Sequence, residues 1–534
     1  MGEVESQPDQ QRPPEVPVTT RRDPRRDASV AGFVGIAGAT GVLGLLNVAA
    51  PGAPFPPFQL AQSLVRATPG GVATFFIENL GHLALPLGVI AISGLFLLLG
   101  LLLGRLIPLL ETKLGGNSVV ACFLAMTPAW LLWFAVSPPG LRKAHLGGYL
   151  TTLATGIVAS TLLSAFAIRK MREEPAVTGP SDPSRRYFMR AAAAGAGGIV
   201  VGAVGLNRIV RPGSDPSAGE LVVPTLSPAA SPPSSGAAFE IDGLTPEITP
   251  IKDFYTVDEA FVDPSIDTAD WKLAISGLVS DPVALSYDRI RSMPAIERFQ
   301  TLACISNPVG GDLISTTKWT GIPVRHLLEE AGVSGKGVEV VFKAADGFSD
   351  SLSLDQAMDE STLLVVGMDG RPLSRSHGYP ARLLSIGTYG MKNPKWLTEI
   401  EVVDHAYDGF WEQRGWAKVA PVKTQVRIDV PRDARVGVET VVAGMAFAGD
   451  RGVSRLELSD DGGDTWTDAQ LKPPLSDLTW VLWKVPWTPQ REGSQELVAR
   501  ATDGRGDVQT SMIADPHPEG ASGLESAVVD VSAA

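Results

Sequence analysis

Residues 301–328 of this 534-residue chain read TLACISNPVGGDLISTTKWTGIPVRHLL. The preceding residues Glu297–Ala303 alternate as in a β-strand, so Cys304 stands where a strand ends and a glycine-containing loop begins. Val324–Ala331 has the pattern of a short helix. A cysteine placed here faces whatever occupies the loop, although a cysteine taken alone is more often a small core residue. The only other cysteine, Cys122, leaves too few thiols for a disulfide framework, a Cys-ligated zinc site or a four-cysteine iron–sulfur cluster.

Three motifs in the second half of the chain resemble the sulfite oxidase family of molybdopterin-dependent oxidoreductases. They are Cys304 and Asn307 with WTGIP at 319–323, HGYPAR at 377–382 with KWL at 395–397, and ITP at 248–250 with FY at 254–255. They occur in the family's order, and the resemblance covers residues 239–415. It implies an α+β molybdopterin-binding domain that carries a molybdenum–molybdopterin cofactor.

The resemblance also assigns roles to individual residues. Cys304 is expected to ligate the metal, because the pterin supplies two dithiolene sulfurs and a thiolate adds a third soft ligand. The implied catalytic residues are Cys304 and Asn307, and the implied cofactor-binding residues are Tyr255, Thr256, Asp346, His377, Arg382, Asn393 and Lys395. A pterin phosphate needs fixed cations, which suits Arg382 and Lys395. From the residues alone, Arg382 and Lys395 are equally suited to surface ion pairs. His377 is equally suited to be a core histidine whose ring nitrogens are hydrogen-bonded.

The first half of the chain holds four apolar blocks, each without an Asp, Glu, Lys or Arg. They are Ser29–Ala50, Leu83–Gly104, Ser118–Val136 and Gly147–Ile168. Each has about 20 residues, enough for a helix to cross a hydrocarbon core of roughly 30 Å. We therefore expect a four-helix transmembrane region at residues 29–170, preceded by a disordered cytoplasmic tail at 1–28. The alternative is four buried helices of a large soluble domain.

A fifth, weaker apolar block follows at Ala191–Leu206. Just before it, Ser184–Arg190 reads SRRYFMR and resembles the twin-arginine export signal, which serves proteins that fold around a cofactor before export. The alternative is a pair of arginines that only anchors the topology. Because no Ala-x-Ala cleavage site follows, we expect residues 184–210 to remain as a signal and fifth transmembrane helix.

The basic residues predict that the N-terminus lies inside the cell. The inner side then collects Arg21, Arg22, Arg25, Arg26, Arg105, Lys113, Arg169, Lys170, Arg172, Arg185, Arg186 and Arg190; the outer side collects Arg66, Arg142, Lys143, Arg208 and Arg211. Five crossings make the chain a multi-pass protein of the cell membrane, with everything after Val210 on the extracytoplasmic side. His82 and His145 fall near the outer ends of the second and fourth helices, where they either bind haem or are interfacial polar residues.

Two further segments complete the chain. Residues 211–238 are rich in Pro, Ser, Gly and Ala and are expected to form a linker. Residues 421–534 show short strands separated by turn signals, which predict a β-sandwich. The stretch GMAFAGDRGVSRLELSDDGGDTW at 444–466 resembles the immunoglobulin-like domain that mediates dimers of sulfite oxidases. A spacer or binding module without a dimer role is the alternative.

The chain departs from sulfite oxidases where those enzymes hold their anion. Val309 stands where the family has an arginine five residues after the ligand cysteine, and Thr256–Asp258 replaces a second arginine. Val366 and Gly367 stand where the family has a tyrosine. Lys318 and Arg325 are possible replacements for the lost cations. A pocket that loses cations and gains Asp258 should bind a small dianion poorly, so the resemblance carries over the cofactor but not sulfite.

Three functions therefore remain open. The first is a membrane-anchored molybdopterin oxidoreductase that works by oxo transfer on the outer face, with a quinone- or cytochrome-type partner docked at the helices. The second is an exported reductase of the methionine-sulfoxide type, against which residues 421–534 count. The third is a non-enzymatic, membrane-tethered binding protein. The formal net charge of −13 argues against a nucleic-acid partner.

Overall fold

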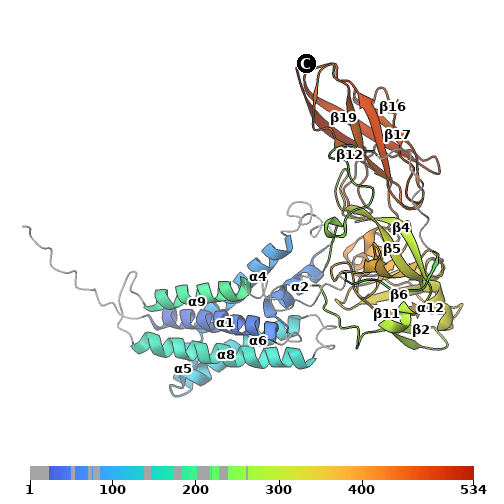
Figure 1. Ribbon diagram of the computed structural model, residues 1–534. Coiled ribbons are helices and arrows are strands. Elements are labelled where there is room, and N and C mark those ends of the chain that lie inside the picture. Colours follow the sequence, from blue (N-terminus) through green and yellow to red (C-terminus); the bar gives the residue numbers. More distant parts are fainter. Residues whose placement is uncertain are drawn as a thin grey trace, which may run out of the picture. The chain divides into compact units, whose positions relative to one another are not determined.

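The computed structural model describes residues 23–49, 54–69, 84–137, 146–173, 183–200, 219–227, 239–259 and 263–533, with Val72, Phe75 and Ser217 (Figure 1). The chain divides into two compact units. The first comprises Met1–Leu64 and Leu85–Pro212 and is helical. The second comprises Val65–Ala84 and Gly213–Ala534 and carries the β-sheets. Each unit is described by itself.

The helices of the first half agree with the four strong apolar blocks. They are α1 (Pro24–Ala49), α2 (Pro56–Ala67), α4 (Ala84–Gly104), α5 (Ile107–Lys113), α6 (Ser118–Val136), α8 (Leu146–Glu173) and α9 (Pro183–Val200). The segments long and apolar enough to cross a membrane are Pro24–Leu46, Leu87–Lys113, Ser118–Val136 and Leu146–Glu173. The short helices α2 and α5 were not predicted. Helix α5 has only seven residues, and α2 is amphipathic and lies outside the continuous apolar blocks on which the prediction rested.

The fifth predicted span, residues 184–210, is described only in part. Helix α9 begins at Pro183 and continues to Val200, so the segment with Arg185 and Arg186 and the first ten residues of the apolar block form one helix. The arginines lower the hydropathy of α9 below that of a spanning helix. Residues 201–206 of the predicted block lie outside the described residues, as do His82 and His145.

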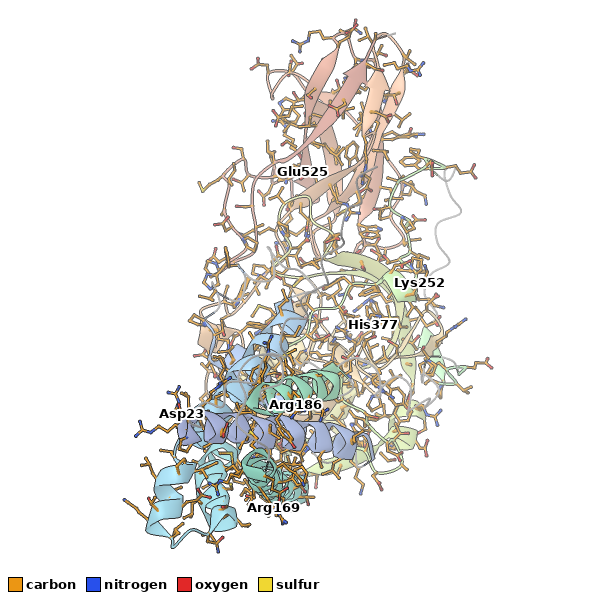
Figure 2. All side chains as sticks on the ribbon, turned by 90° about the vertical axis from the view of Figure 1, so that its left-hand side faces the viewer. Asp23, Arg169, Arg186, Lys252, His377 and Glu525 are labelled. Carbon is orange, nitrogen blue, oxygen red and sulfur yellow. The ribbon has the colours of Figure 1, made fainter. Side chains whose placement is uncertain are left out.

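Small residues let the helices of the first unit approach closely. A methyl group on Gly32 of α1 would collide with the backbone of Gly100 in α4, and one on Gly104 would collide with Ala28. Close backbone contact through glycine is typical of helix pairs in membranes. Helix α9 packs on α1 through the rings of Phe33 and Phe188, whose centroids are 4.6 Å apart. The start of α1, the end of α8 and the start of α9 lie at one end of the bundle, where Figure 2 labels Asp23, Arg169 and Arg186.

The first domain of the second unit consists of two sheets over one core. One sheet has the order β1 (Thr225–Ser227), β4 (Ala295–Ala303), β5 (Ile314–Pro323), β8 (Leu363–Met368) and β10 (Arg382–Leu384), with β9 (Arg371–Pro372) paired to β8. The other has the order β3 (Val283–Ser286), β2 (Lys272–Gly277), β11 (Leu397–Val403), β6 (Glu339–Ala344) and β7 (Ser349–Ser353). Short helices α11 (Tyr287–Arg291), α12 (Val324–Glu330) and α13 (Leu354–Ala357) complete the α+β domain.

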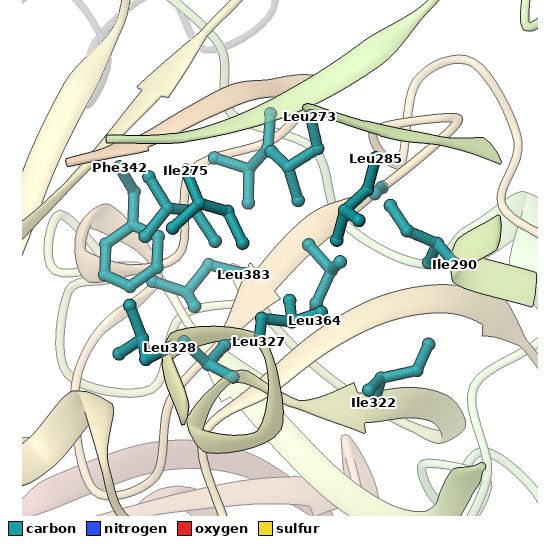
Figure 3. Packing of buried hydrophobic residues seen from close by; sticks show 14 of the residues in the cluster. Leu273, Ile275, Leu285, Ile290, Ile322, Leu327, Leu328, Phe342, Leu364 and Leu383 are labelled. Atoms are coloured by element: carbon teal, nitrogen blue, oxygen red, sulfur yellow. The ribbon is translucent and has the colours of Figure 1, made fainter. Parts of the chain in front are cut away.

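The core of this domain is built from both sheets and the three short helices. Figure 3 shows Leu273 and Phe342 of one sheet facing Leu364 and Leu383 of the other, with Leu327 of α12 beside them. These five side chains are fully buried. A core of this kind fixes the strand ends rigidly, and the loops that follow β4 and precede β10 leave the same sheet.

Part of the predicted linker belongs to this sheet. Strand β1 pairs in parallel with β4, and the Ala295 amide donates to the Pro224 carbonyl at 2.7 Å. Leu221 and Val223 pack against the core. The prediction of a plain linker at 211–238 is therefore wrong for Leu221–Ser227, because the abundance of proline and serine in the segment hides one short apolar run.

The C-terminal domain is built of strands only. One sheet has the order β12 (Gln425–Val430), β14 (Thr440–Phe447), β18 (Val481–Trp487) and β17 (Gln470–Leu471). The other has the order β13 (Asp433–Arg435), β20 (Glu525–Ser532), β19 (Gly493–Asp503), β15 (Val453–Ser459) and β16 (Thr467–Asp468). Buried residues of both sheets, Trp483 and Leu497 among them, share one core. The β-rich domain expected from the sequence is confirmed, and its immunoglobulin type stays a prediction.

The C-terminal domain contacts the loop that follows Cys304. The Arg427 guanidinium donates to the Gly311 carbonyl at 3.2 Å, and the Glu525 carboxylate lies against Gly310, whose φ is +72°. A side chain on Gly310 would collide with that carboxylate. The loop is therefore held from the side of the second domain as well as by its own sheet.

Glu525 should make the stability of the chain depend on pH. Burial raises the pKa of its carboxyl from about 4.5 to about 7, with Asp429 adding to the shift and Arg427 opposing it. Between these pH values the folded state keeps a proton that the unfolded state releases, so stability falls as pH rises from about 4.5 to 7. Thermal scans of the full chain should show that Glu525→Gln flattens this slope. Glu496→Gln, at an exposed site on β19, should leave it unchanged; equal slopes in all three proteins would contradict the assignment.

Candidate active site

A cavity lies beside the end of β4. Its walls come from the opening segment 254–259, the Cys304 loop, the stretch 377–396 and two tryptophans further on. The predicted site residues that line it are Tyr255, Thr256, Cys304, Asp346, His377, Arg382, Asn393 and Lys395. Residues up to 140 positions apart in the sequence are thus brought to one place.

Cys304 follows directly on β4, and its position is fixed by the backbone. Its amide donates to the Leu313 carbonyl at 2.9 Å, which closes the loop, and its Sγ lies 3.0 Å from Oγ of Ser306. Burial raises the pKa of the thiol, and the bonds from Ser306 oppose that shift. A thiol in such a place keeps its proton unless a cation binds to the sulfur. Its chemistry therefore suits a metal ligand better than a free nucleophile.

Arg382 is a buried cation at the start of β10. Its guanidinium donates to the carbonyls of His377 at 3.2 Å and Asn393 at 3.4 Å, and lies 5.2 Å from the centre of the Trp319 ring. Burial lowers its pKa to about 10. Among the described residues, no carboxylate forms an ion pair with it and no acceptor reaches its Nε. An uncompensated buried charge costs several kcal/mol, so the site fits a bound anion such as a phosphate.

Lys395 and Asp258 form an ion pair that lines the cavity. The ammonium also donates to the Ser376 carbonyl at 2.8 Å and lies 4.5 Å from the centre of the Trp396 ring. Gly378, with φ +104°, lies between Lys395 and Arg382: a side chain there would reach 3.0 Å and 3.1 Å from their Cβ atoms. Only glycine adopts this backbone freely, and it lets the two cations approach the same cavity.

His377 ties the opening segment to the rest of the site. Its Nε2 lies 3.3 Å from the Ile251 carbonyl, and its ring meets Phe254 edge-on at 5.4 Å. Phe254 in turn stacks on Tyr255 at 5.7 Å, and burial holds the pKa of the Tyr255 phenol well above its ordinary value. The opening segment, with Thr256 exposed at its end, is thus fixed against the sheet that carries Cys304.

Three of the predicted residues support loops. The Asn393 amide accepts from the Ser385 backbone at 2.6 Å, and the Asp346 carboxylate accepts from the Phe348 amide at 3.0 Å. Asn307 lies outside the cavity lining: its side chain accepts from Leu313 at 2.9 Å and donates to Gln425 of the C-terminal domain at 3.1 Å. These contacts brace the Cys304 loop, and a catalytic role for Asn307 stays a prediction.

The suggested replacement cations also lie outside the cavity lining. Lys318 pairs with Glu297 at 3.1 Å, and Arg325 pairs with Glu329 at 2.7 Å. Opposite charges on the neighbouring strand or the next helical turn capture these side chains. Neither residue can rebuild an anion site from where it stands.

Sequence reasoning missed several cavity residues. They are Glu259, which is 4% exposed, and the aromatic residues Phe348, Trp411 and Trp416. One signal for the tryptophans was present, because FWEQRGW at 410–416 holds three aromatic residues within seven positions. Glu259 carried no signal of its own, since a lone glutamate is ordinarily a solvated surface residue.

The fold and the cavity define a cofactor-binding oxidoreductase domain joined to a β-rich domain, and comparisons with known proteins agree. Residues 260–411 match the family described as oxidoreductase molybdopterin binding domain. Residues 418–514 match the Mo-co oxidoreductase dimerisation domain.

Three relatives illustrate the range of similar proteins. The mitochondrial sulfite oxidase of Drosophila melanogaster is 28% identical over 317 residues, covering 48% of this chain and 55% of that protein. The uncharacterized oxidoreductase YuiH of Bacillus subtilis is 31% identical over 150 residues, covering 28% of this chain and 74% of that protein. Nitrate reductase [NADH] 2 of Phaseolus vulgaris is 27% identical over 322 residues, covering 48% of this chain and 36% of that protein.

The chain belongs to the sulfite-oxidase-type molybdopterin oxidoreductases, a family that carries a molybdenum–molybdopterin cofactor. It spans little more than half the length of the curated sulfite oxidase from Drosophila. The family resemblance found in the sequence is thereby confirmed at the level of the domain and its cofactor.

Replacing Cys304 by serine is expected to abolish turnover and leave the organic part of the cofactor bound, because Arg382, Lys395 and His377 lie on other loops. X-ray absorption at the molybdenum edge should count one sulfur fewer in Cys304→Ser than in the wild type. Arg382→Ala tests the binding of the pterin instead of the metal. It removes charge-assisted hydrogen bonds worth about 1.5–3 kcal/mol each, so the pterin content should fall. Equal sulfur counts in Cys304→Ser and the wild type would contradict the metal-ligand assignment.

Proposed function

We propose that this chain is a membrane-anchored molybdopterin oxidoreductase that acts on the extracytoplasmic face of the cell membrane. The observation that carries the proposal is the pairing, in one cavity, of a buried thiol at Cys304 with a buried, uncompensated guanidinium at Arg382. One is suited to a soft metal and the other to a phosphate. When bound, the molybdenum cofactor supplies two-electron chemistry with transfer of an oxygen atom to or from a substrate.

In this proposal the protein's own residues bind the cofactor, orient it and limit the access of water to it. Cys304 ligates the metal, Arg382 and Lys395 hold the anionic end of the pterin, and His377 and Tyr255 fix the opening segment over it. The aromatic wall formed by Trp411 and Trp416 shields the cavity from water, which strengthens every polar contact inside it. Asn307 keeps the Cys304 loop closed.

The charges of the cavity disfavour a dianionic substrate. Beside the cations Arg382 and Lys395, the lining holds the carboxylates Asp258, Glu259 and Asp346. Asp258 already neutralises Lys395, and the cofactor phosphate adds further negative charge. We therefore infer a substrate that carries less charge than sulfite.

Replacing Asp258 by asparagine should improve the use of anions. The change releases Lys395 and removes a like charge, an effect of about 1–3 kcal/mol at a half-buried site, so kcat/KM for sulfite should rise roughly ten- to hundred-fold. Steady-state kinetics at constant molybdenum content measures this. Glu297→Gln is the control, because it releases Lys318 outside the cavity and should change nothing. Fast sulfite oxidation by the wild type, with a micromolar KM, would contradict the inference that the charges of the cavity disfavour a dianionic substrate.

The orientation and oligomeric state rest on separate observations. The described basic residues of the predicted inner side belong to the start of α1, the turn between α4 and α5, the end of α5, the end of α8 and the start of α9. An excess of Arg and Lys on one side favours the cytoplasm for that side. The match to a dimerisation domain at 418–514 supports a homodimer through the C-terminal domain.

Export through a twin-arginine signal can be tested separately from catalysis. Changing Arg185 and Arg186 together to lysine should leave α1, α4, α6 and α8 inserted while the domains after residue 210 stay cytoplasmic. Protease added to spheroplasts measures the side directly. Arg169→Lys, at the end of α8, serves as the control and should not change it. Digestion of the double variant from outside, to the same extent as the wild type, would contradict the assignment of Arg185 and Arg186 to an export signal.

A further inference from the structure

A second hollow lies at the arginine-rich end of the helical unit. It opens to the surface and is lined by the exposed residues Arg25 and Arg26 at the start of α1, Arg105 just after α4, and Arg185 in α9. The acidic residue in this lining is Asp23. The hollow lies wholly within the first unit and shares no lining residue with the cavity around Cys304.

Helix packing brings Arg105 and Arg185 beside Arg25 and Arg26, which are neighbours in the sequence. The backbones of α1 and α4 touch at Gly32, Gly100 and Gly104. The rings of Phe33 and Phe188 join α1 to α9. The lining carries four arginines and one carboxylate, Asp23, so its net charge is positive and a bound anion lowers the repulsion between the arginines.

The rest of the hollow is apolar. Its remaining lining includes Val30, Leu101 and Phe188, of which Val30 is buried. Val30 and Leu101 belong to the membrane-spanning candidates Pro24–Leu46 and Leu87–Lys113. The hollow thus offers charge at the rim and hydrocarbon below it, which is the order of groups in a phospholipid. A free phosphate would use only the arginines.

We propose that this hollow binds an anionic phospholipid of the leaflet on the arginine-rich side, with the lipid phosphate on the arginines and an acyl chain along the apolar wall. Basic pockets between transmembrane helices are suited to such headgroups. The lipid would bridge α1, α4 and α9 and so hold the start of α9 to the bundle. This use of Arg185 is additional to its role in the proposed export signal.

The basic residues could instead serve topology alone, because the positive-inside rule gathers arginines at this end without any pocket. Lys113 and Arg169 provide the distinction. Both belong to the same end of the bundle, and neither lines the hollow. If the arginines acted only on topology or by diffuse electrostatic attraction, replacing Lys113 and Arg169 would change lipid binding as much as replacing the arginines of the hollow.

The test uses the full chain, purified in detergent and titrated with mixed micelles of phosphatidylglycerol or phosphatidylcholine, with bound lipid counted by native mass spectrometry. The wild type should prefer phosphatidylglycerol. Arg25→Gln with Arg105→Gln should bind it roughly 30-fold more weakly, whereas Lys113→Gln with Arg169→Gln should stay within about three-fold of the wild type. Should the first pair fail to fold, Arg105→Gln alone, expected to be about five-fold weaker, carries the same comparison.

Three results would overturn the proposal. One is equal binding of the two lipids by the wild type. Another is an equal loss of binding in the two double variants, which would indicate diffuse attraction. The third is inorganic phosphate displacing phosphatidylglycerol at micromolar concentration, which would indicate a site for a soluble anion. A failure of sulfite or molybdenum experiments would leave this test untouched, because the hollow shares no residue with the catalytic cavity.

Discussion

The burial of one guanidinium constrains the catalytic domain more than any other interaction. Arg382 lies 4% exposed at the start of β10, supported by two backbone carbonyls and an indole face, without a carboxylate partner among the described residues. A cation can be kept there only by a rigid surround, because any collapse around it would leave its donors unsatisfied. The two-sheet core beneath supplies that rigidity, and it also fixes the end of β4, where Cys304 stands.

The remaining charges of the cavity follow from this constraint. Lys395 approaches Arg382 only because Gly378 leaves room, and Asp258 then neutralises Lys395. The result is a site with a fixed place for one anionic group and little capacity for a second. Relatives named sulfite oxidase and nitrate reductase are similar to this chain over 317 and 322 residues, so proteins with different named activities share this region of sequence.

The sequence predicted those features that depend on local pattern. Strand β4 ends at Ala303, as the alternation of Glu297–Ala303 predicted, and eight of the predicted cofactor or catalytic residues line one cavity, because motif spacing reflects strand ends. What the sequence did not show depends on tertiary partners. Strand β1 pairs with the edge of β4, and α9 packs on α1 through Phe188 and Phe33. Asn307 lies outside the cavity lining and bonds to Leu313 and to Gln425 of the C-terminal domain, so its catalytic role stays a prediction.

The contact between the Cys304 loop and the C-terminal domain has a consequence for biosynthesis. The loop is held by Gln425 and Arg427, which follow Asn307 and Gly311 by 118 and 116 residues. A ribosome has therefore passed the whole catalytic domain before the strand that braces this loop emerges. Until then the loop is held only by contacts within the catalytic domain, such as the hydrogen bonds between Cys304, Asn307 and Leu313. The last support of the loop is therefore added late in synthesis.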